Sequence, residues 1–285
     1  MFVLVVNHHF KHNVGPEAFM KKKIITTVLL SAPISLNAAE FPRLDEALPS
    51  LIDISAQVPV FDWDGDGCYP AAGVSRNGEM NPGLKPTGAL NGSCRDAGFL
   101  DISNTLHRYA CIQGSDGQEY CAQAYDTYYE KDQAIPGIGL GGHRHDWESV
   151  IIWTIDDTVA FGSVSCHGDL ETKPREQLPM EGEHLKVVYH KDGILTHCIR
   201  FAKDNEVAEN HYGQFVTPPI TSWYELSGDN LSNEAMRNKL NSFDYGKASI
   251  KVKDSSFLTH INQWRPAGFP QFTQQSVEAS NPYYT

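Results

Sequence analysis

The chain has 285 residues, of which 41% are hydrophobic, and it carries a formal net charge of −12 at pH 7. This length and apolar content suffice for one sizeable core, so we expect a single main domain. The acidic balance argues against nucleic acid as a partner and against attachment to anionic lipid by bulk positive charge. It suits a protein that binds divalent cations.

The first forty residues differ in composition from the rest. Residues 20–23 read Met-Lys-Lys-Lys, an apolar run follows over 24–34, and small residues occupy much of 35–39. This order is typical of a secretory signal peptide over residues 20–39, and we interpret residues 1–19 as an over-extended start. The apolar run is too short to span a membrane comfortably. We therefore expect a secreted protein with one domain over residues 40–285.

Residues 59–98 are dense in Gly, Pro, Asn and Asp, which favour successive surface turns. Within them, Asp62, Asp64 and Asp66 of DWDGDG stand at the first, third and fifth positions of a calcium-loop pattern, with glycine at the sixth. The twelfth position is Gly73, and no helix pattern flanks the segment, so an EF-hand is excluded. A weak second calcium site and a plain Asp-Gly turn both remain open.

Strand patterns follow downstream. Residues 120–129 are rich in aromatic side chains with partial alternation, and residues 149–155 form a nearly continuous apolar run with many β-branched side chains. Only residues 233–243 show a clear amphipathic helix pattern, with Ser232 as its N-terminal cap. Short strands, frequent turns and few helices predict a mostly β fold, a single β-sandwich with peripheral helices.

A hairpin is predicted over residues 184–201, with Asp192-Gly193 as its turn. In its second strand, the period of two places Leu195, His197, Ile199 and Phe201 on one face. A histidine among apolar neighbours is more often a core residue with satisfied polar atoms than a ligand. A binding role for His197 depends on whether this hairpin returns beside a functional cluster.

The densest group of titratable side chains is the run GGHRHDWE at residues 141–148. Its glycines allow a tight turn, and we expect a strand to begin near Asp146, with Asp146 and Glu148 on one face and Trp147 on the other. Two carboxylates with one or two imidazoles suit magnesium, calcium or manganese better than structural zinc. Arg144, as a fork that binds carboxylates, and His145 are assigned supporting roles. A polar strand end with solvated charges is the alternative.

Hydrolytic signatures are missing from the sequence. Neither H-E-x-x-H nor G-x-S-x-G occurs, so a zincin and a serine-esterase elbow have no support. A metal-dependent glycan hydrolase or lyase that uses Asp146 or Glu148 as its base remains an alternative, because two carboxylates near a metal serve that purpose as well.

Six cysteines in an exported chain favour disulfides over zinc binding or catalysis. Sequence order alone leaves other connectivities open, but we expect neighbours to pair. The expected pairs are Cys68 with Cys94, Cys111 with Cys121, and Cys166 with Cys198.

The segment GHRHDWE resembles the hallmark of the necrosis- and ethylene-inducing peptide-like (NLP) proteins, a family of secreted cytolysins. DGDGCYP at 64–70, NPGLK at 81–85, SCHG at 165–168 and VVYHKDG at 187–193 are similar to further family segments and follow in the same order. The similarity covers roughly residues 59–257, and the extra cysteines place the chain with the family branch that has them. The resemblance implies a non-enzymatic, necrosis-inducing virulence factor with a β-sandwich similar to actinoporins and fungal lectins.

The same resemblance implies how such a protein works. A divalent cation, magnesium or calcium, would lie in a surface cavity that binds the sugar headgroup of plant glycosyl inositol phosphoryl ceramides. Peripheral contact with the host membrane and damage to it would follow, from a protein that is a monomer in solution.

The family motif also carries over residue by residue. The ion would be held by Asp132, His143, Asp146 and Glu148, partly through water, with His197 beside the sugar site and His167 lining the cavity. The branch with extra cysteines implies calcium at the DWDGDG loop as well. This chain departs from the family in having Cys166, where alanine is common, and a longer GIGLGG loop before His143.

Overall fold

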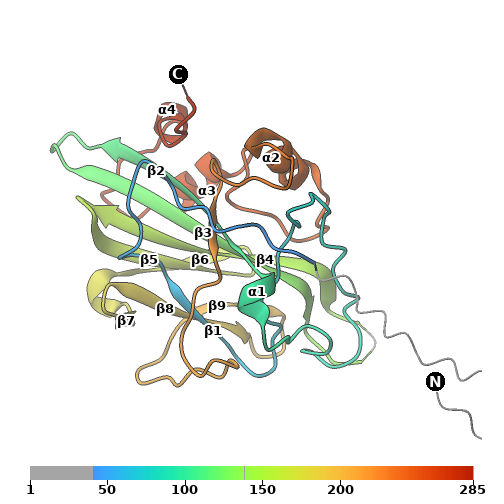
Figure 1. Ribbon diagram of the computed structural model, residues 1–285. Coiled ribbons are helices and arrows are strands. Elements are labelled where there is room, and N and C mark those ends of the chain that lie inside the picture. The colour runs from blue at the N-terminus through green and yellow to red at the C-terminus, as the bar shows by residue number, and fades with distance from the viewer. Residues whose placement is uncertain (1–40, 138, 285) are drawn as a thin grey trace, which may run out of the picture. The chain divides into compact units, whose positions relative to one another are not determined.

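The computed structural model describes residues 41–137 and 139–284. The predicted signal peptide and the predicted extension over residues 1–19 lie outside this range. The described chain forms two β-sheets packed face to face, with the C-terminal helices on the outer side of the larger sheet (Figure 1). The mostly β fold with peripheral helices, predicted from short strands and frequent turns, is confirmed.

The larger sheet has six strands in the order β10-β2-β3-β4-β5-β6. Its strands are β2 (Thr105–Gln113), β3 (Glu119–Gln133), β4 (Gly142–Ile155), β5 (Thr158–Cys166), β6 (Asp169–Pro174) and β10 (Ile220–Ser222). Neighbours from β2 to β6 pair antiparallel, whereas β10 pairs parallel with β2.

The smaller sheet is arranged around β8 (His184–Lys191), which pairs parallel with β1 (Val60–Trp63) and antiparallel with β9 (His197–Phe201). The short strand β7 (Met180–Glu181) pairs with the start of β8. The remaining elements are α1 (Phe99–Ile102), the 3-10 turn η1 (Arg175–Gln177), α2 (Asn233–Ser242), α3 (Phe257–Trp264) and α4 (Gln274–Glu278).

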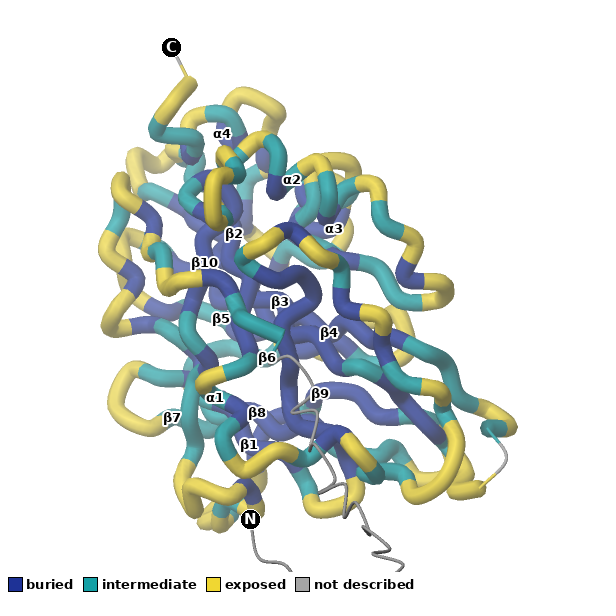
Figure 2. Tube along the Cα trace, turned by 45° about the vertical axis from the view of Figure 1, so that its right-hand side comes forward, coloured by how far each residue is buried: buried dark blue, intermediate teal, exposed yellow. Residues whose placement is uncertain are grey.

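Two apolar clusters account for the layers. One lies between the sheets and includes Trp63, Tyr129 and Tyr189. The other lies between the larger sheet and the helices, and it includes Trp147 and Met236. Buried residues run along the strands of both sheets, while exposed residues collect on the loops (Figure 2). Since successive strand residues point to opposite faces, β3 and β4 feed both clusters at once.

Helix α2 begins where the sequence predicts. The Ser232 side chain accepts a hydrogen bond from the backbone N–H of Ala235, which satisfies one of the free amides of the first turn. Met236 and Leu240 point into the outer apolar cluster, as helical spacing requires.

Two strand boundaries differ from the sequence prediction. Strand β4 begins at Gly142, because the GGHRHDWE run pairs with β3 along almost its whole length. Only His145 breaks this ladder, with a φ of 62°. In the predicted hairpin, β9 begins at His197, so Ile194 and Leu195 lie in an exposed loop and do not share the buried face.

Three disulfides form, and they are the pairs of sequence neighbours that we expected. Cys111 and Cys121 face each other across β2 and β3. Cys166 and Cys198 connect β5 of the larger sheet to β9 of the smaller one, so they join the two layers.

Among residues 41–137 and 139–284, no helix combines the length and the apolar content needed to cross a membrane.

Candidate functional site

The end of the β3–β4 hairpin gathers three potential metal ligands. Asp132 and His143 are directly opposite each other in the strand register, and Asp146 lies opposite Tyr129, three residues further along β4 and beyond the positive φ of His145. One ligand atom from each of the three lies within 4.8 Å of the other two. Asp132 and Asp146 are buried, whereas the His143 side chain is 21% exposed. His143 therefore lies at the outer edge of this donor set.

Gly142 allows this close pairing. A Cβ at residue 142 would lie 2.6 Å from the backbone oxygen of Asp132, a distance that side chains do not tolerate. The second glycine of the GGHRHDWE run is thus required where β3 and β4 approach each other, and not for a turn.

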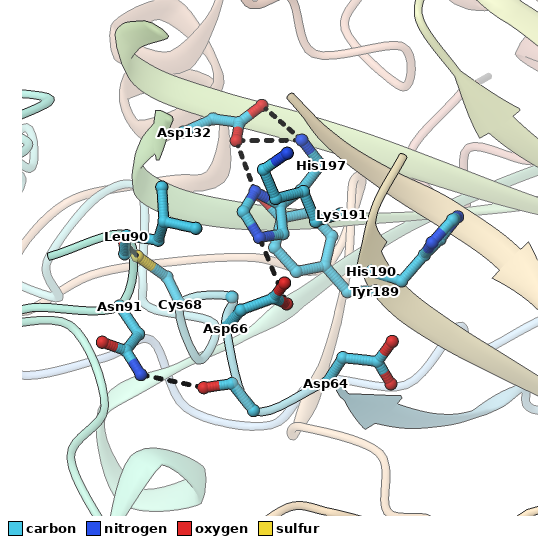
Figure 3. Close-up of polar contacts among 12 residues, drawn as sticks. Asp64, Asp66, Cys68, Leu90, Asn91, Asp132, Tyr189, His190, Lys191 and His197 are labelled. Atoms are coloured by element: carbon cyan, nitrogen blue, oxygen red, sulfur yellow. Dashed lines mark hydrogen bonds and ion pairs between the residues drawn. The ribbon is translucent and has the colours of Figure 1, made fainter. Parts of the chain in front are cut away.

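His197 contacts the donor set from the other sheet. Its backbone N–H donates to both carboxylate oxygens of Asp132, each at 3.0 Å, and its Nδ1 lies 2.7 Å from Oδ1 of the same carboxylate (Figure 3). The ring is buried, but its partner is a carboxylate and not an apolar core. The hairpin of β8 and β9 therefore does bring His197 beside the acidic donor set, which was the condition for a binding role.

Tyr189 completes the inner wall of the site. Its hydroxyl donates to Oδ2 of Asp146 at 3.1 Å, and its ring stacks on Tyr129 with centroids 3.7 Å apart. The other neighbour of its ring is His197. Sequence reasoning missed Tyr189, although the period of two in β8 places it on the face that turns toward the larger sheet.

The site is crowded with negative charge. Burial, followed by the nearby Asp132 carboxylate, raises the pKa of the Asp146 carboxyl well above its usual range. Burial and the Asp146 carboxylate likewise raise the pKa of Glu148. Among the described residues, no Lys or Arg forms an ion pair with Asp132, Asp146 or Glu148.

A divalent cation fits this environment. Two buried carboxylates and one imidazole with converging donor atoms form the mixed oxygen and nitrogen set that magnesium, calcium or manganese accepts. A bound cation would also offset the burial of the Asp146 and Glu148 carboxyls and the repulsion from neighbouring carboxylates, which together raise their pKa values. Asp132, His143 and Asp146 are the residues that would hold it.

Glu148 lies two residues after Asp146 in β4, on the same face of the strand. Its carboxylate accepts a hydrogen bond from the hydroxyl of Ser165 on β5, and it lies outside the three-residue donor set. Asp146 and Glu148 do share a face, and Trp147 points to the opposite cluster, as predicted.

His167 is placed differently from its expected role. It lies just after β5, and its Nε2 is 3.1 Å from the exposed carboxylate of Asp192. The His167 ring thus contacts Asp192 and not the acidic donor set. The neighbouring sulfurs of Cys166 and Cys198 are linked to each other, so they do not act as metal ligands here.

The DWDGDG carboxylates do not gather into one calcium site. Asp62 is fully buried and accepts hydrogen bonds from the backbone N–H groups of Glu209 and Asn210. Asp64 faces Arg200 at 3.5 Å, and Asp66 points toward His197. Alternation along β1 and the turn after it sends the three side chains to different partners, so the calcium-loop interpretation is not supported by their placement.

The contacts of Arg144 and His145 differ in detail from the supporting roles expected from the sequence. Arg144 donates to the backbone oxygens of Pro82 and Gly83, and it forms no ion pair with a carboxylate within residues 41–137 and 139–284. His145 turns to the outer cluster, where its Nδ1 lies 2.6 Å from the Tyr128 hydroxyl. Both residues fix the β4 segment from outside the donor set.

Comparison with known proteins gives the site a context. The family model described as "Necrosis inducing protein (NPP1)" matches residues 55–264. The chain belongs to the necrosis-inducing protein family. The family predicted from the GHRHDWE segment is thereby confirmed, and the matched range contains every residue of the donor set as well as His197.

Relatives from oomycetes agree with the assignment to the necrosis-inducing family. "Necrosis-inducing protein NPP1" of Phytophthora nicotianae is 30% identical over 203 residues, which cover 69% of this chain and 75% of that protein. "NLP effector protein 10" of Phytophthora capsici is 27% identical over 206 residues, with 70% of this chain and 77% of that protein covered.

Solved structures of this family share the fold. "NLPPya in complex with mannosamine" superposes with a TM-score of 0.62 at 25% identity, covering 82% of this chain and 96% of that one. "Toxin fold as basis for microbial attack and plant defense" gives 0.61 at 25% identity, over 77% and 94%. The "non-toxic HaNLP3 protein" gives 0.60 at 25% identity, over 78% and 95%.

Proposed function

We propose that this chain is a secreted, non-enzymatic cytolysin that binds the sugar headgroup of plant glycosyl inositol phosphoryl ceramides in a metal-dependent manner and then damages the plasma membrane. The observation that carries the proposal is the donor set at the end of one hairpin, in which Asp132 and Asp146 are buried and His143 is half-buried. Burying two adjacent carboxylates is costly unless a cation compensates them, so the arrangement favours a bound ion.

Asp132, His143 and Asp146 would hold a magnesium or calcium ion, with Glu148 behind them. The bound ion would coordinate sugar hydroxyls. His197 is fixed by Asp132 and Tyr189 orients Asp146, so these residues keep the donor set in place.

The comparisons support sugar as the ligand class. A relative with the same fold has been solved in complex with mannosamine. A non-toxic relative shares the fold to a similar degree, so the fold by itself does not determine lysis. Headgroup binding and membrane damage are therefore two separate steps of the proposal, each with its own measurement.

The non-enzymatic part rests on the surroundings of the two carboxylates. A general base must reach a substrate proton. Asp146 and Glu148 are both buried and already accept hydrogen bonds from Tyr189 and Ser165. These contacts suit metal binding by Asp146 and a supporting role for Glu148 better than the role of base in a glycan hydrolase or lyase.

The test is release of calcein from vesicles that contain plant glycosyl inositol phosphoryl ceramides, with and without a chelator. Wild type is compared with Asp146→Ala and with the matched control Asp204→Ala, which removes an exposed carboxylate outside the donor set. We expect release by wild type and by Asp204→Ala, and its loss with Asp146→Ala or after chelation.

Other outcomes identify other functions. Binding to the vesicles without release by folded wild type would indicate a non-lytic, lectin-like protein. Turnover of a plant cell-wall glycan would indicate the metal-dependent enzyme. Release that persists in folded Asp146→Ala would contradict the role of the donor set.

A further inference from the structure

A second group of potential metal ligands lies where β5 of the larger sheet meets β9 of the smaller one. Cys166 ends β5, His167 follows it, and Cys198 is the second residue of β9. One ligand atom from each of these three residues lies within 4.8 Å of the other two. No member of this group belongs to the acidic donor set, so the two groups are separate.

His190 adds a fourth imidazole or thiol side chain to this place. It pairs directly with Cys198 across β8 and β9, and its Nε2 lies 3.7 Å from the Cys198 sulfur. Ligand atoms of a tetrahedral zinc ion lie roughly 3.3 to 3.8 Å apart, which follows from zinc–ligand bonds of about 2.0 to 2.3 Å. Burial, followed by the nearby Arg200, lowers the pKa of His190. Its ring is therefore neutral at pH 7, which is the form that binds metals.

The backbone at His167 points to a role for its side chain. His167 and Gly168 form the two-residue turn between β5 and β6, and their φ angles of 52° and 93° are both positive. Asn-Gly is the favoured pair in such a turn, so turn geometry does not explain a histidine at its first position.

The His167 ring is also oriented as in many metal sites. Its Nε2 lies 3.1 Å from the carboxylate of Asp192, and no hydrogen bond within residues 41–137 and 139–284 engages its Nδ1. A carboxylate on one ring nitrogen fixes the tautomer and leaves the other nitrogen to bind a metal. The side chain is 30% exposed, so an ion has access from solvent.

The sulfurs of Cys166 and Cys198 are joined in a disulfide, so they bind a metal only after reduction. Cys166 is partly exposed, whereas Cys198 is fully buried. A thiolate from solvent can therefore attack the Cys166 sulfur, and the Cys198 sulfur then leaves beside the His190 ring.

We propose that reduction of the Cys166–Cys198 disulfide by a dithiol converts it into a zinc site, formed by the two thiolates with the imidazoles of His167 and His190. The dithiol supplies two electrons and two protons that break the S–S bond, and it is itself oxidised to a disulfide. Binding of Zn²⁺ then releases the two protons of the thiols. The ion takes over the link between β5 and β9, so the two sheets stay joined at this end.

Zinc suits these four ligands better than magnesium or calcium does. Two thiolates and two imidazoles are the ligands of tetrahedral structural zinc sites, whereas magnesium and calcium take oxygen ligands. The charges of two thiolates also balance that of the ion. The acidic donor set and this site would thus select different metals, and the zinc site goes beyond the proposed headgroup binding and does not depend on it.

The experiment uses Co²⁺ as a probe for zinc, because thiolate ligands give cobalt a strong charge-transfer absorption that oxygen ligands do not give. The full chain is reduced with dithiothreitol, freed of excess reductant without air and titrated with cobalt. We expect a thiolate–cobalt band that saturates at one ion per chain and disappears when zinc is added. The oxidised chain should give no band. Alkylation followed by mass spectrometry identifies the cysteines that were reduced.

Cysteine and histidine variants identify the ligands. Cys166→Ala/Cys198→Ala keeps the other four cysteines and should give no band. His167→Asn places the favoured residue in the turn but removes the imidazole, and His190→Gln keeps a polar side chain in β8. Each should lower cobalt affinity by about tenfold or more. His211→Ala, at an exposed histidine outside the group, is the matched control and should leave the affinity unchanged.

Several results would overturn the inference. One is the absence of a band although alkylation shows that Cys166 and Cys198 are both free. Another is a disulfide that dithiothreitol reduces only when circular dichroism shows an unfolded chain. A band that persists in Cys166→Ala/Cys198→Ala, or that keeps wild-type affinity in both histidine variants, would assign the cobalt to other ligands. A band that depends on all four side chains supports the inference.

Discussion

Asp132 and His197 lie 65 positions apart in sequence, on opposite sheets, and they share three polar contacts of 2.7 to 3.0 Å. The contacts join the end of β3 to the first residue of β9. Because β9 pairs with β8 alone among the described strands and follows an exposed loop, this carboxylate fixes the position of the strand start as well as that of the imidazole. Asp132 thus supports both the proposed metal ligands and the imidazole of His197.

Asp132→Asn should separate these roles from overall folding. The amide keeps one acceptor but turns an NH₂ group toward the donors of His197, which we expect to cost about 1–3 kcal/mol of stability. Titration calorimetry with calcium and magnesium should show affinity reduced by tenfold or more, since a charged ligand is lost. Asp204→Asn is the control, and unchanged metal affinity in folded Asp132→Asn would contradict the assigned donor set.

Removal of the Cys166–Cys198 disulfide should loosen the same strand start. The loop closed by this bond has a sequence separation of 32, so its loss should reduce the free energy of unfolding by about 4 kcal/mol. The double variant Cys166→Ala/Cys198→Ala, studied by urea denaturation, tests this. The Cys111→Ala/Cys121→Ala variant is the comparison, because its bond closes a shorter loop, with a separation of 10, between strands that already pair. A larger loss in that comparison variant would refute the argument.

His107 should make the protein sensitive to acid. Burial lowers the pKa of this histidine from 6.5 to about 3. Above pH 6.5 the ring is neutral in both states, whereas below it the unfolded chain takes up a proton that the folded chain does not. The free energy of unfolding should therefore fall between about pH 6.5 and pH 3, by up to about 5 kcal/mol from this group.

His107→Phe removes that dependence without removing a hydrogen bond within the described chain, because neither ring nitrogen has a partner there. The ring stacks beside Tyr109 and Tyr125, which tolerate a phenyl group. Denaturation at pH 7.5 and pH 4.5 measures the effect. We expect similar stability at pH 7.5 and a smaller loss at pH 4.5 than in wild type; equal losses would show that the imidazole does not carry the effect.

Ser232→Ala should destabilise the protein by about 1 kcal/mol, because the N–H of Ala235 loses its side-chain acceptor at the start of α2. Ser227→Ala, at an exposed serine outside the helix, is the control and should change stability little. Urea denaturation of both variants provides the measurement. A loss of less than a few tenths of a kcal/mol in Ser232→Ala would mean that water replaces the cap.

The sequence by itself determined those parts of the structure that depend on residues close together in the chain. Alternation predicted the strands and placed Asp146 and Glu148 on one face, with Trp147 on the other. The cap at Ser232 and the helical spacing after it predicted α2. The GHRHDWE segment, through its resemblance to a family, predicted the sandwich that the structure shows. These features follow from backbone periodicity and capping, which act over a few residues.

Only the tertiary structure decided which residues the buried strand faces contact. Periodicity states that His197 is on a buried face, but only the packing of the two sheets places it on Asp132 and places Tyr189 on Asp146. The same packing separated Asp62, Asp64 and Asp66, which look like one site in the sequence, and brought Asp66 to His197. Contacts across a sandwich depend on loop lengths and on how side chains fill the space between the sheets, and no short stretch of sequence contains that information.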